Sequence, residues 1–249
     1  MLKIIKSAVA SIVLTMVVLA GSVVGPQAHN QYLRWEVGES VVQVLHPLRN
    51  GGGTGFAVKG KSGKKYIMTN RHVCAAQVDG KIRIVLQDGS ALTRKVVYVD
   101  RQHDLCLIAG IDKLSPLDVS KQELQVGATL YAVGHPGLRQ LTVSSGEYIG
   151  HEEIQMLHDA RTELECLQAN GVMIPLPPII QILTGQEFAC LIKLDTLQTT
   201  TVIYGGNSGS PAVNMWGNVI GVVFAGNRSQ EHDNYIVPLS EVKRVLNKF

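Results

Sequence analysis

The sequence predicts an all-β protein built from antiparallel strands. Short runs of alternating apolar and polar residues recur from residue 38 onward, separated by turn sequences such as LRNGGG, GKSGKK and QDGS. Such runs with glycine-rich turns are typical of antiparallel barrels and sandwiches. The chain has 249 residues, of which 45% are hydrophobic and 17% charged. This length suits one large domain or two barrels of about 100 residues each, and the composition excludes a disordered chain.

The strands are expected wherever the alternation is bounded by turn residues. In chain order these segments are residues 40–46, 53–60, 65–70, 81–87, 91–100, 105–110, 129–135, 141–150, 190–196, 212–226 and 233–239. Residues 111–124 carry Pro116 and several charges, so we expect a linker there. The segment from residue 239 to the end has apolar residues at helical spacing, which predicts a closing helix with Ser240 as its N-cap.

The N-terminus differs from the rest of the chain. Lys3 and Lys6 precede an uncharged apolar run that ends in small residues, with Val18-x-Ala20 as a candidate cleavage site. We interpret residues 1–29 as a cleaved export signal, with a membrane anchor through residues 4–24 as the main alternative and a buried helix as a third. The first two interpretations place the remaining chain outside the cytoplasm, either periplasmic, secreted or anchored to the membrane.

Four cysteines fit an oxidising compartment, where disulfides persist. We expect a bridge between Cys166 and Cys190, which would close a loop rich in proline. For Cys74 and Cys106 both a bridge and a pair of buried free thiols remain open. None of the spacings is that of a zinc site, so no metal and no cofactor are expected.

Basic residues are scattered, and the formal net charge is +3. The one lysine-rich tract, at residues 59–65, is interpreted as a solvated hairpin tip rather than a nucleic-acid patch, so no nucleic-acid partner is expected.

The stretch YGGNSGSP at residues 204–211 surrounds one serine with glycines, which weaken an ordinary strand and instead indicate a sharp turn. His72 follows the apolar strand KYIMTN, and Asp104 stands at the mouth of the strand LCLIAG. A serine hydroxyl becomes a useful nucleophile when an imidazole takes its proton and a carboxylate fixes the imidazole tautomer. The three residue types therefore predict a nucleophilic triad in the order His, Asp, Ser.

With these motifs the chain resembles the chymotrypsin-fold serine proteases, and more closely their bacterial HtrA/Deg-type branch. The matching pieces are GTGFAV, TNRHV, HDLCLI, LYAVGHP, SSGEYIG and GGNSGSPAVN with GNVIGVVFA, which span about residues 40–246 apart from an interruption near 152–190. The resemblance implies two antiparallel β-barrels. Residues 30–115 would form the first and residues 116–249 the second, with an insertion at about 151–192 and a C-terminal helix at about 239–248.

The resemblance also implies a serine endopeptidase, with protein or peptide substrates as its partners. Ser208 would be the nucleophile, His72 the general base and then acid, and Asp104 the carboxylate that orients it. The backbone N–H groups of Gly206 and Ser208 would form the oxyanion hole. The pocket before the scissile bond would be lined by Val202, Ile203, Val223, Phe224, Ala225 and Tyr235. None of these carries a carboxylate, which favours a small or aliphatic substrate residue over a lysine or arginine.

Several features depart from the family or favour another class. Asn207 stands where trypsin-like enzymes have an aspartate, and no IVGG-like start follows a basic residue, so no trypsin-style zymogen switch is expected. A PDZ domain is also not expected. The insertion would be a lid, a docking surface or an oligomer contact, with residues 151–171 permissive for a helix. The main alternative function is an inactive, protease-like protein that binds peptides. An α/β-hydrolase esterase is not favoured, because its triad would need the chain order Ser, Asp, His, which this sequence does not have.

Overall fold

The protein was analysed as a computed structural model, which describes residues 26–46, 51–75, 77–158, 162–226 and 234–249. The chain forms two compact units, residues 1–32 and residues 33–249. Helix α2, Pro26–Glu36, runs across that boundary and was not expected from the sequence. The apolar run expected to be a signal or anchor lies outside the described residues. Within the described ranges, no helix is both long enough and apolar enough to span a bilayer.

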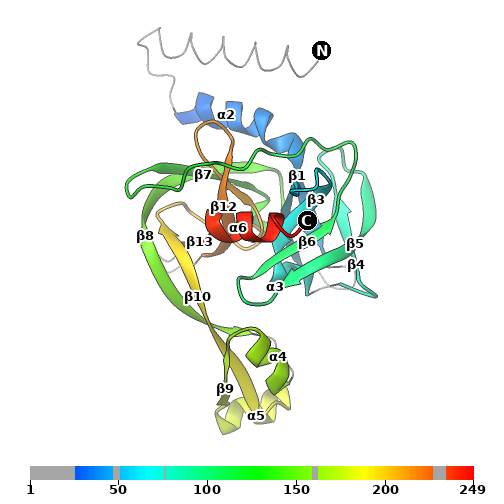
Figure 1. The fold of residues 1–249 in the computed structure, drawn as a ribbon, viewed down its shortest axis with the longest axis vertical. Coiled ribbons are helices and arrows are strands. Elements are labelled where there is room, and N and C mark those ends of the chain that lie inside the picture. The colour runs from blue at the N-terminus through cyan, green and yellow to red at the C-terminus, as the bar shows by residue number, and fades with distance from the viewer. Residues whose placement is uncertain (1–25, 47–50, 76, 159–161, 227–233) are drawn as a thin grey trace. The chain divides into compact units, whose positions relative to one another are not determined.

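Six strands close into a barrel in the first half of the larger unit (Figure 1). They are β1 Val41–Leu45, β2 Gly52–Lys59, β3 Lys65–Asn70, β4 Lys81–Val85, β5 Ala91–Asp100 and β6 Leu105–Ala109, in the order β1-β2-β3-β6-β5-β4. Their alternating apolar side chains meet inside the barrel, where Val44, Ile67 and Ile108 are fully buried. A 3-10 turn, η1 Gly38–Ser40, precedes β1.

Seven strands form the second sheet. They are β7 Thr129–Gly134, β8 Thr142–His158, β9 Val172–Pro175, β10 Phe188–Thr199, β11 Pro211–Val213, β12 Val219–Gly226 and β13 Asn234–Pro238. The order is β13-β12-β11-β7-β8-β10-β9, and a further pairing of β13 with β10 closes six of these strands on one another. Its core includes Leu130, Val223 and Ile236. The predicted all-β class is confirmed.

Helix α6, Leu239–Leu246, packs against β12 and β13 through its buried apolar face, as its spacing predicted. The prediction of Ser240 as the N-cap was wrong. The strand β13 runs directly into the helix, so Pro238 occupies the cap position and Ser240 lies in the first turn.

The insertion is largely an extension of the sheet. Residues 151–158 continue β8 and pair with β10, so the helix permitted there does not form. Among the described residues of that stretch, the helical part is α4, Glu163–Gln168, which begins after Thr162, whose side chain accepts a hydrogen bond from Glu165 N. Beyond it lie β9 and helix α5, Pro178–Thr184, at the far end of the β8–β10 pair in Figure 1. The predicted disulfide between Cys166 and Cys190 is present.

Candidate active site

Ser208 lies in a turn that only glycine can build at two positions. Gly206 has φ +95° and Gly209 has φ +84°, both in the left-handed region that side chains rarely adopt. A Cβ at Gly206 would lie 2.4 Å from the carbonyl oxygen of His135, and one at Gly209 would lie 2.2 Å from that of Thr54. The glycines in GGNSG are therefore required by backbone conformation and by close packing.

His72 and Asp104 are brought together by neighbouring strands of the first barrel. His72 lies in the short helix α3, Arg71–Cys74, directly after β3, and Asp104 directly precedes β6. Asn70, at the end of β3, pairs with Leu105, at the start of β6. This register places the two candidate residues side by side at one end of the barrel.

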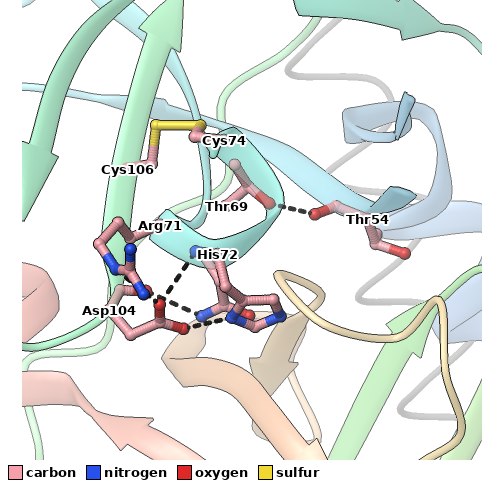
Figure 2. Close-up of a disulfide and its surroundings, with 8 residues drawn as sticks. Thr54, Thr69, Arg71, His72, Cys74, Asp104 and Cys106 are labelled. Atoms are coloured by element: carbon pink, nitrogen blue, oxygen red, sulfur yellow. Dashed lines mark hydrogen bonds and ion pairs between the residues drawn. A yellow bond between two sulfur atoms is a disulfide. The ribbon is translucent and has the colours of Figure 1, made fainter. Parts of the chain in front are cut away.

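Two hydrogen bonds join the pair, as Figure 2 shows. His72 Nδ1 lies 2.6 Å from Asp104 Oδ2, and the backbone N–H of His72 donates to Asp104 Oδ1 at 3.0 Å. Asp104 is buried, with 1% of its surface exposed, and has a left-handed φ of +52°. A non-glycine residue in that conformation stores backbone strain, which is typical of functional positions. The carboxylate can thus fix which nitrogen of the imidazole carries the proton.

A buried cation accompanies this carboxylate. Arg71 Nε lies 3.4 Å from Asp104 Oδ1, and the Arg71 N–H donates to the Asp104 carbonyl at 2.9 Å. Asn70 Nδ2 donates to the same carbonyl at 3.1 Å. Arg71 was not predicted as a site residue, and the only signal for it in the sequence was a basic residue next to His72 in TNRHV. Arg71 places a positive charge beside the buried carboxylate.

A second disulfide, Cys74–Cys106, ties α3 to β6 beside the pair (Figure 2). Both cysteines are buried, and of the two options left open for them the structure has the bridge. Cys74 lies in the helical turn that carries His72, and the bridge connects that turn to the strand that begins after Asp104.

His72 and Ser208 line the same cavity, which has a volume of about 440 Å³. Ser208 Oγ donates to the carbonyl oxygen of Phe224 at 3.3 Å, and the Phe224 ring meets the His72 ring nearly at right angles, with 5.9 Å between centroids. The remaining lining residues are Met156, Ile203, Tyr204, Gly205 and Phe224. None of these lining residues carries a carboxylate.

The expected pocket residues are placed unequally. Ile203 and Phe224 line the cavity, Val202 is 45% exposed, and Val223 is packed in the core of the second sheet. Tyr235 is half-buried and pairs with Ala225, whose side chain lies outside the described part of the structure. These assignments stay predictions.

The sequence analysis missed Met156, Tyr204 and Gly205 as cavity residues. Tyr204 and Gly205 directly precede the glycine turn, so their position next to Ser208 in the sequence was a signal that could have found them. Met156 comes from the far part of β8, opposite Ile192 of β10. The local sequence around Met156 gives no sign that this part of β8 reaches the cavity.

The backbone around Gly206 presents N–H groups. The carbonyl of Gly205 accepts from Gly137 N at 2.6 Å, and the carbonyl of Gly206 accepts from Thr54 Oγ1 at 2.8 Å. Within the described residues, the N–H groups of Gly206 and Ser208 donate to no protein acceptor. They are available for a negatively charged oxygen.

His135 packs closely against this backbone, since its carbonyl oxygen would lie 2.4 Å from a Cβ at Gly206. It is buried, its Nδ1 lies 2.8 Å from the Arg139 carbonyl, and its Nε2 lies 3.0 Å from Gln87 Nε2. Burial lowers the pKa of His135, which favours the neutral ring. Elsewhere, no group of three or more His, Cys, Asp or Glu among the described residues is arranged to hold a metal ion.

The protein combines an antiparallel barrel and a second antiparallel sheet with a serine, held in a glycine turn, that lines the same cavity as the histidine of a His–Asp pair. This combination is typical of the class of trypsin-like folds. The family model described as the trypsin-like peptidase domain matches residues 53–222. The chain therefore belongs to the trypsin-like peptidase family.

Curated relatives point to one branch of that family. A probable periplasmic serine endoprotease DegP-like from Chlamydia trachomatis is 30% identical over 201 residues, covering 79% of this chain and 33% of that protein. The serine protease Do-like HtrA of Bacillus subtilis is 25% identical over 221 residues, covering 84% of this chain and 41% of that protein. The chain thus spans less than half the length of these relatives, and its similarity is to the HtrA/Deg branch.

Solved structures agree on the fold. The Rv3671c protease from M. tuberculosis in its active form has a TM-score of 0.61 and 20% identity, covering 88% of this chain and 84% of that chain. The serine endoprotease from Yersinia pestis has a TM-score of 0.61 and 21% identity, covering 90% of this chain and 67% of that chain.

Proposed function

We propose that this protein is a serine endopeptidase in which Ser208, His72 and Asp104 form the catalytic triad. The observation that carries the proposal is the buried Asp104 carboxylate bonded to His72 Nδ1 while His72 and Ser208 line one cavity. Family membership supports hydrolysis of peptide bonds, and the curated relatives named above are serine endoproteases or serine proteases.

The proposed reaction begins with a rotation of the serine side chain. Ser208 Oγ leaves the Phe224 carbonyl and donates to His72 Nε2, which is the imidazole nitrogen not bonded to Asp104. Oγ then attacks the substrate carbonyl carbon while His72 Nε2 takes the hydroxyl proton. Asp104 holds the ring in the required tautomer and stabilises the imidazolium that forms.

The negative charge on the former carbonyl oxygen would be received by the N–H groups of Gly206 and Ser208. His72 then gives its proton to the leaving amine, the carbon–nitrogen bond breaks, and an acyl ester remains on Ser208. Water attacks this ester with His72 again as the base, which releases the new carboxyl end and restores the hydroxyl.

The apolar lining of the cavity supports a preference for small or aliphatic residues before the scissile bond. Met156, Ile203 and Phe224 offer apolar contacts and no countercharge for a buried lysine or arginine. We propose protein or peptide substrates and a location outside the cytoplasm, periplasmic, secreted or membrane-anchored, in keeping with the relative named as periplasmic and with the two disulfides. Assembly into oligomers through residues 151–192 belongs to the same proposal.

An active-site label tests the triad directly. A fluorophosphonate should modify the purified wild-type protein, and Ser208→Ala should abolish labelling and lower casein cleavage by about 10³-fold or more. His72→Ala should be nearly as damaging, and the double variant little worse, because triad members act as a unit. An unlabelled, stably folded wild type would instead favour the inactive peptide-binding alternative.

A further inference from the structure

Thr54 is a fully buried residue of β2 whose hydroxyl reaches across to the serine turn of the second sheet. Thr54 Oγ1 donates to the carbonyl of Gly206 at 2.8 Å and accepts from the backbone N–H of His135 at 3.0 Å. The direction of both bonds is fixed, because the His135 N–H can only donate and the Gly206 carbonyl can only accept. The single hydroxyl proton of Thr54 must therefore point at Gly206.

The backbone of Thr54 is itself held in place. Its N–H donates to the carbonyl of Ser208 at 2.8 Å, and its carbonyl accepts from Thr69 Oγ1 at 2.6 Å (Figure 2). The packing is tight, since a Cβ at Gly53 would lie 2.5 Å from the Ser208 carbonyl. The β2 backbone and the Thr54 hydroxyl thus bond to alternate carbonyls of the same turn.

Gly206 is restrained on both sides. The peptide before it is fixed through the Gly205 carbonyl, which accepts from Gly137 N, and the peptide after it through the Gly206 carbonyl, which accepts from Thr54. In a trans peptide the C=O of one residue and the N–H of the next point in opposite directions, so the Gly137 bond sets the Gly206 N–H and the Thr54 bond sets the Asn207 N–H. Glycine is the residue that rotates most freely, and at φ +95° it needs such restraint on both sides.

We propose that Thr54 is a positioning residue that holds the peptide between Gly206 and Asn207, and so keeps Gly206 in the backbone conformation in which its N–H can receive the oxyanion. The inference rests on the proposed function for its effect on rate, while its structural part stands by itself. Thr54 touches neither substrate nor the reacting atoms and acts only through the Gly206 peptide. Serine can replace it, because serine keeps the hydroxyl, whereas valine keeps the shape and loses both bonds.

The test compares Thr54→Val with Thr54→Ser in the full chain. We expect Thr54→Val to lower kcat about 10- to 100-fold, less than the loss of a whole oxyanion donor, with KM within about twofold. Thr54→Ser should restore kcat to within about threefold of wild type. A Thr54→Val variant that keeps wild-type kcat, or a Thr54→Ser variant as slow as Thr54→Val, would overturn the proposal.

A matched control separates positioning from general stability. Thr196 is also buried, and its hydroxyl donates to the Glu152 carbonyl at 2.8 Å. Thr196→Val removes the same kind of bond and should lower Tm without changing kcat. If Thr54→Val does not fold, Thr54→Ala is measured instead. Failure of both to fold while Thr196→Val folds would show a requirement for folding and overturn the positioning role.

A crystal structure of Thr54→Val distinguishes failure of this inference from failure of the proposed function. We expect the peptide between Gly206 and Asn207 to rotate away from its wild-type orientation and the Gly206 N–H to shift with it, whether or not the wild type hydrolyses peptides. An unmoved peptide overturns the inference even if the enzyme is active. A rotated peptide in Thr54→Val, together with a wild type that takes no fluorophosphonate, supports the inference and removes the proposed chemistry.

Discussion

Replacing Gly206 with alanine tests the serine turn at its most constrained point. At φ +95° an L-residue costs about 1–2 kcal/mol more than glycine. The added Cβ would also lie 2.4 Å from the His135 carbonyl oxygen and 2.9 Å from the backbone nitrogens of Gly137 and Leu138. All three contacts are backbone atoms, which cannot swing aside as a flexible side chain would. The Gly206 peptide must therefore move.

The two consequences of this movement can be measured separately. A loss of about 1–2 kcal/mol should lower Tm by about 2–8 °C for a chain of this size. Displacement of one oxyanion donor should lower kcat by about 10²–10³-fold and leave KM nearly unchanged, since the donor acts on the transition state. The assays are a thermal melt and steady-state hydrolysis of a peptide ester with an aliphatic residue before the scissile bond.

Gly217→Ala provides the matched control. Gly217 also has a left-handed φ, +82°, but a Cβ there meets only side-chain atoms, the nearest being Val37 at 3.1 Å, and the residue does not line the cavity. This variant should lose stability and keep kcat. If Gly206→Ala melts lower but keeps kcat within about threefold of wild type, the Gly206 N–H is not an oxyanion donor and the reasoning fails.

Three further predictions concern acid stability, the orienting carboxylate and the insertion. Burial opposes ionisation of Asp100, yet hydrogen bonds from His103 and Arg244 and the Arg244 charge outweigh it and hold the pKa of Asp100 below its usual range. The unfolded Asp100 carboxyl takes up a proton as the pH falls through about 4 while the folded one does not, so the free energy of unfolding should fall with pH in that range. Asp100→Asn should reduce this dependence of the unfolding free energy on pH, measured by denaturant titrations. An unchanged dependence would contradict the assignment. Asp104→Asn should fold but lower kcat by about 10⁴-fold, because the amide favours the wrong imidazole tautomer, and a loss below about tenfold would argue against the orienting role. Deleting residues 168–188 should keep fluorophosphonate labelling of Ser208 and change the cleavage of protein substrates or the assembly of the protein. The shortened chain can still connect, because the Cα atoms of Cys166 and Cys190 are 5.5 Å apart and the two remaining residues span that distance. Lost labelling would show that the segment builds the active site.

Much of the fold and the site followed from local sequence. Alternation of apolar residues marks strands because side chains of a strand face opposite sides, and it located most strands of both halves. It missed the short edge strand β9 and the full length of β8 and β10. The single strand expected at residues 212–226 was wrong, because a turn divides it into the antiparallel strands β11 and β12. The glycine turn around Ser208 could be interpreted because left-handed φ values require glycine. His72 and Asp104 stood out since each borders an apolar strand. Even the Cys166–Cys190 bridge could be expected, because it closes one loop.

What the tertiary structure decided depends on contacts between residues far apart in the chain. The strand at residues 151–158 forms because β10 is there to pair with it, which overrides a sequence equally permissive for a helix. Arg71 acquires its role only where β3 and β6 bring it against Asp104, and Met156 reaches the cavity only through the length of β8. Thr54 looks like any strand residue until the two halves meet and its hydroxyl finds the Gly206 carbonyl. Local patterns encode periodicity and turn geometry, whereas these contacts depend on strand register and on how the two barrels close, which no single stretch of sequence specifies.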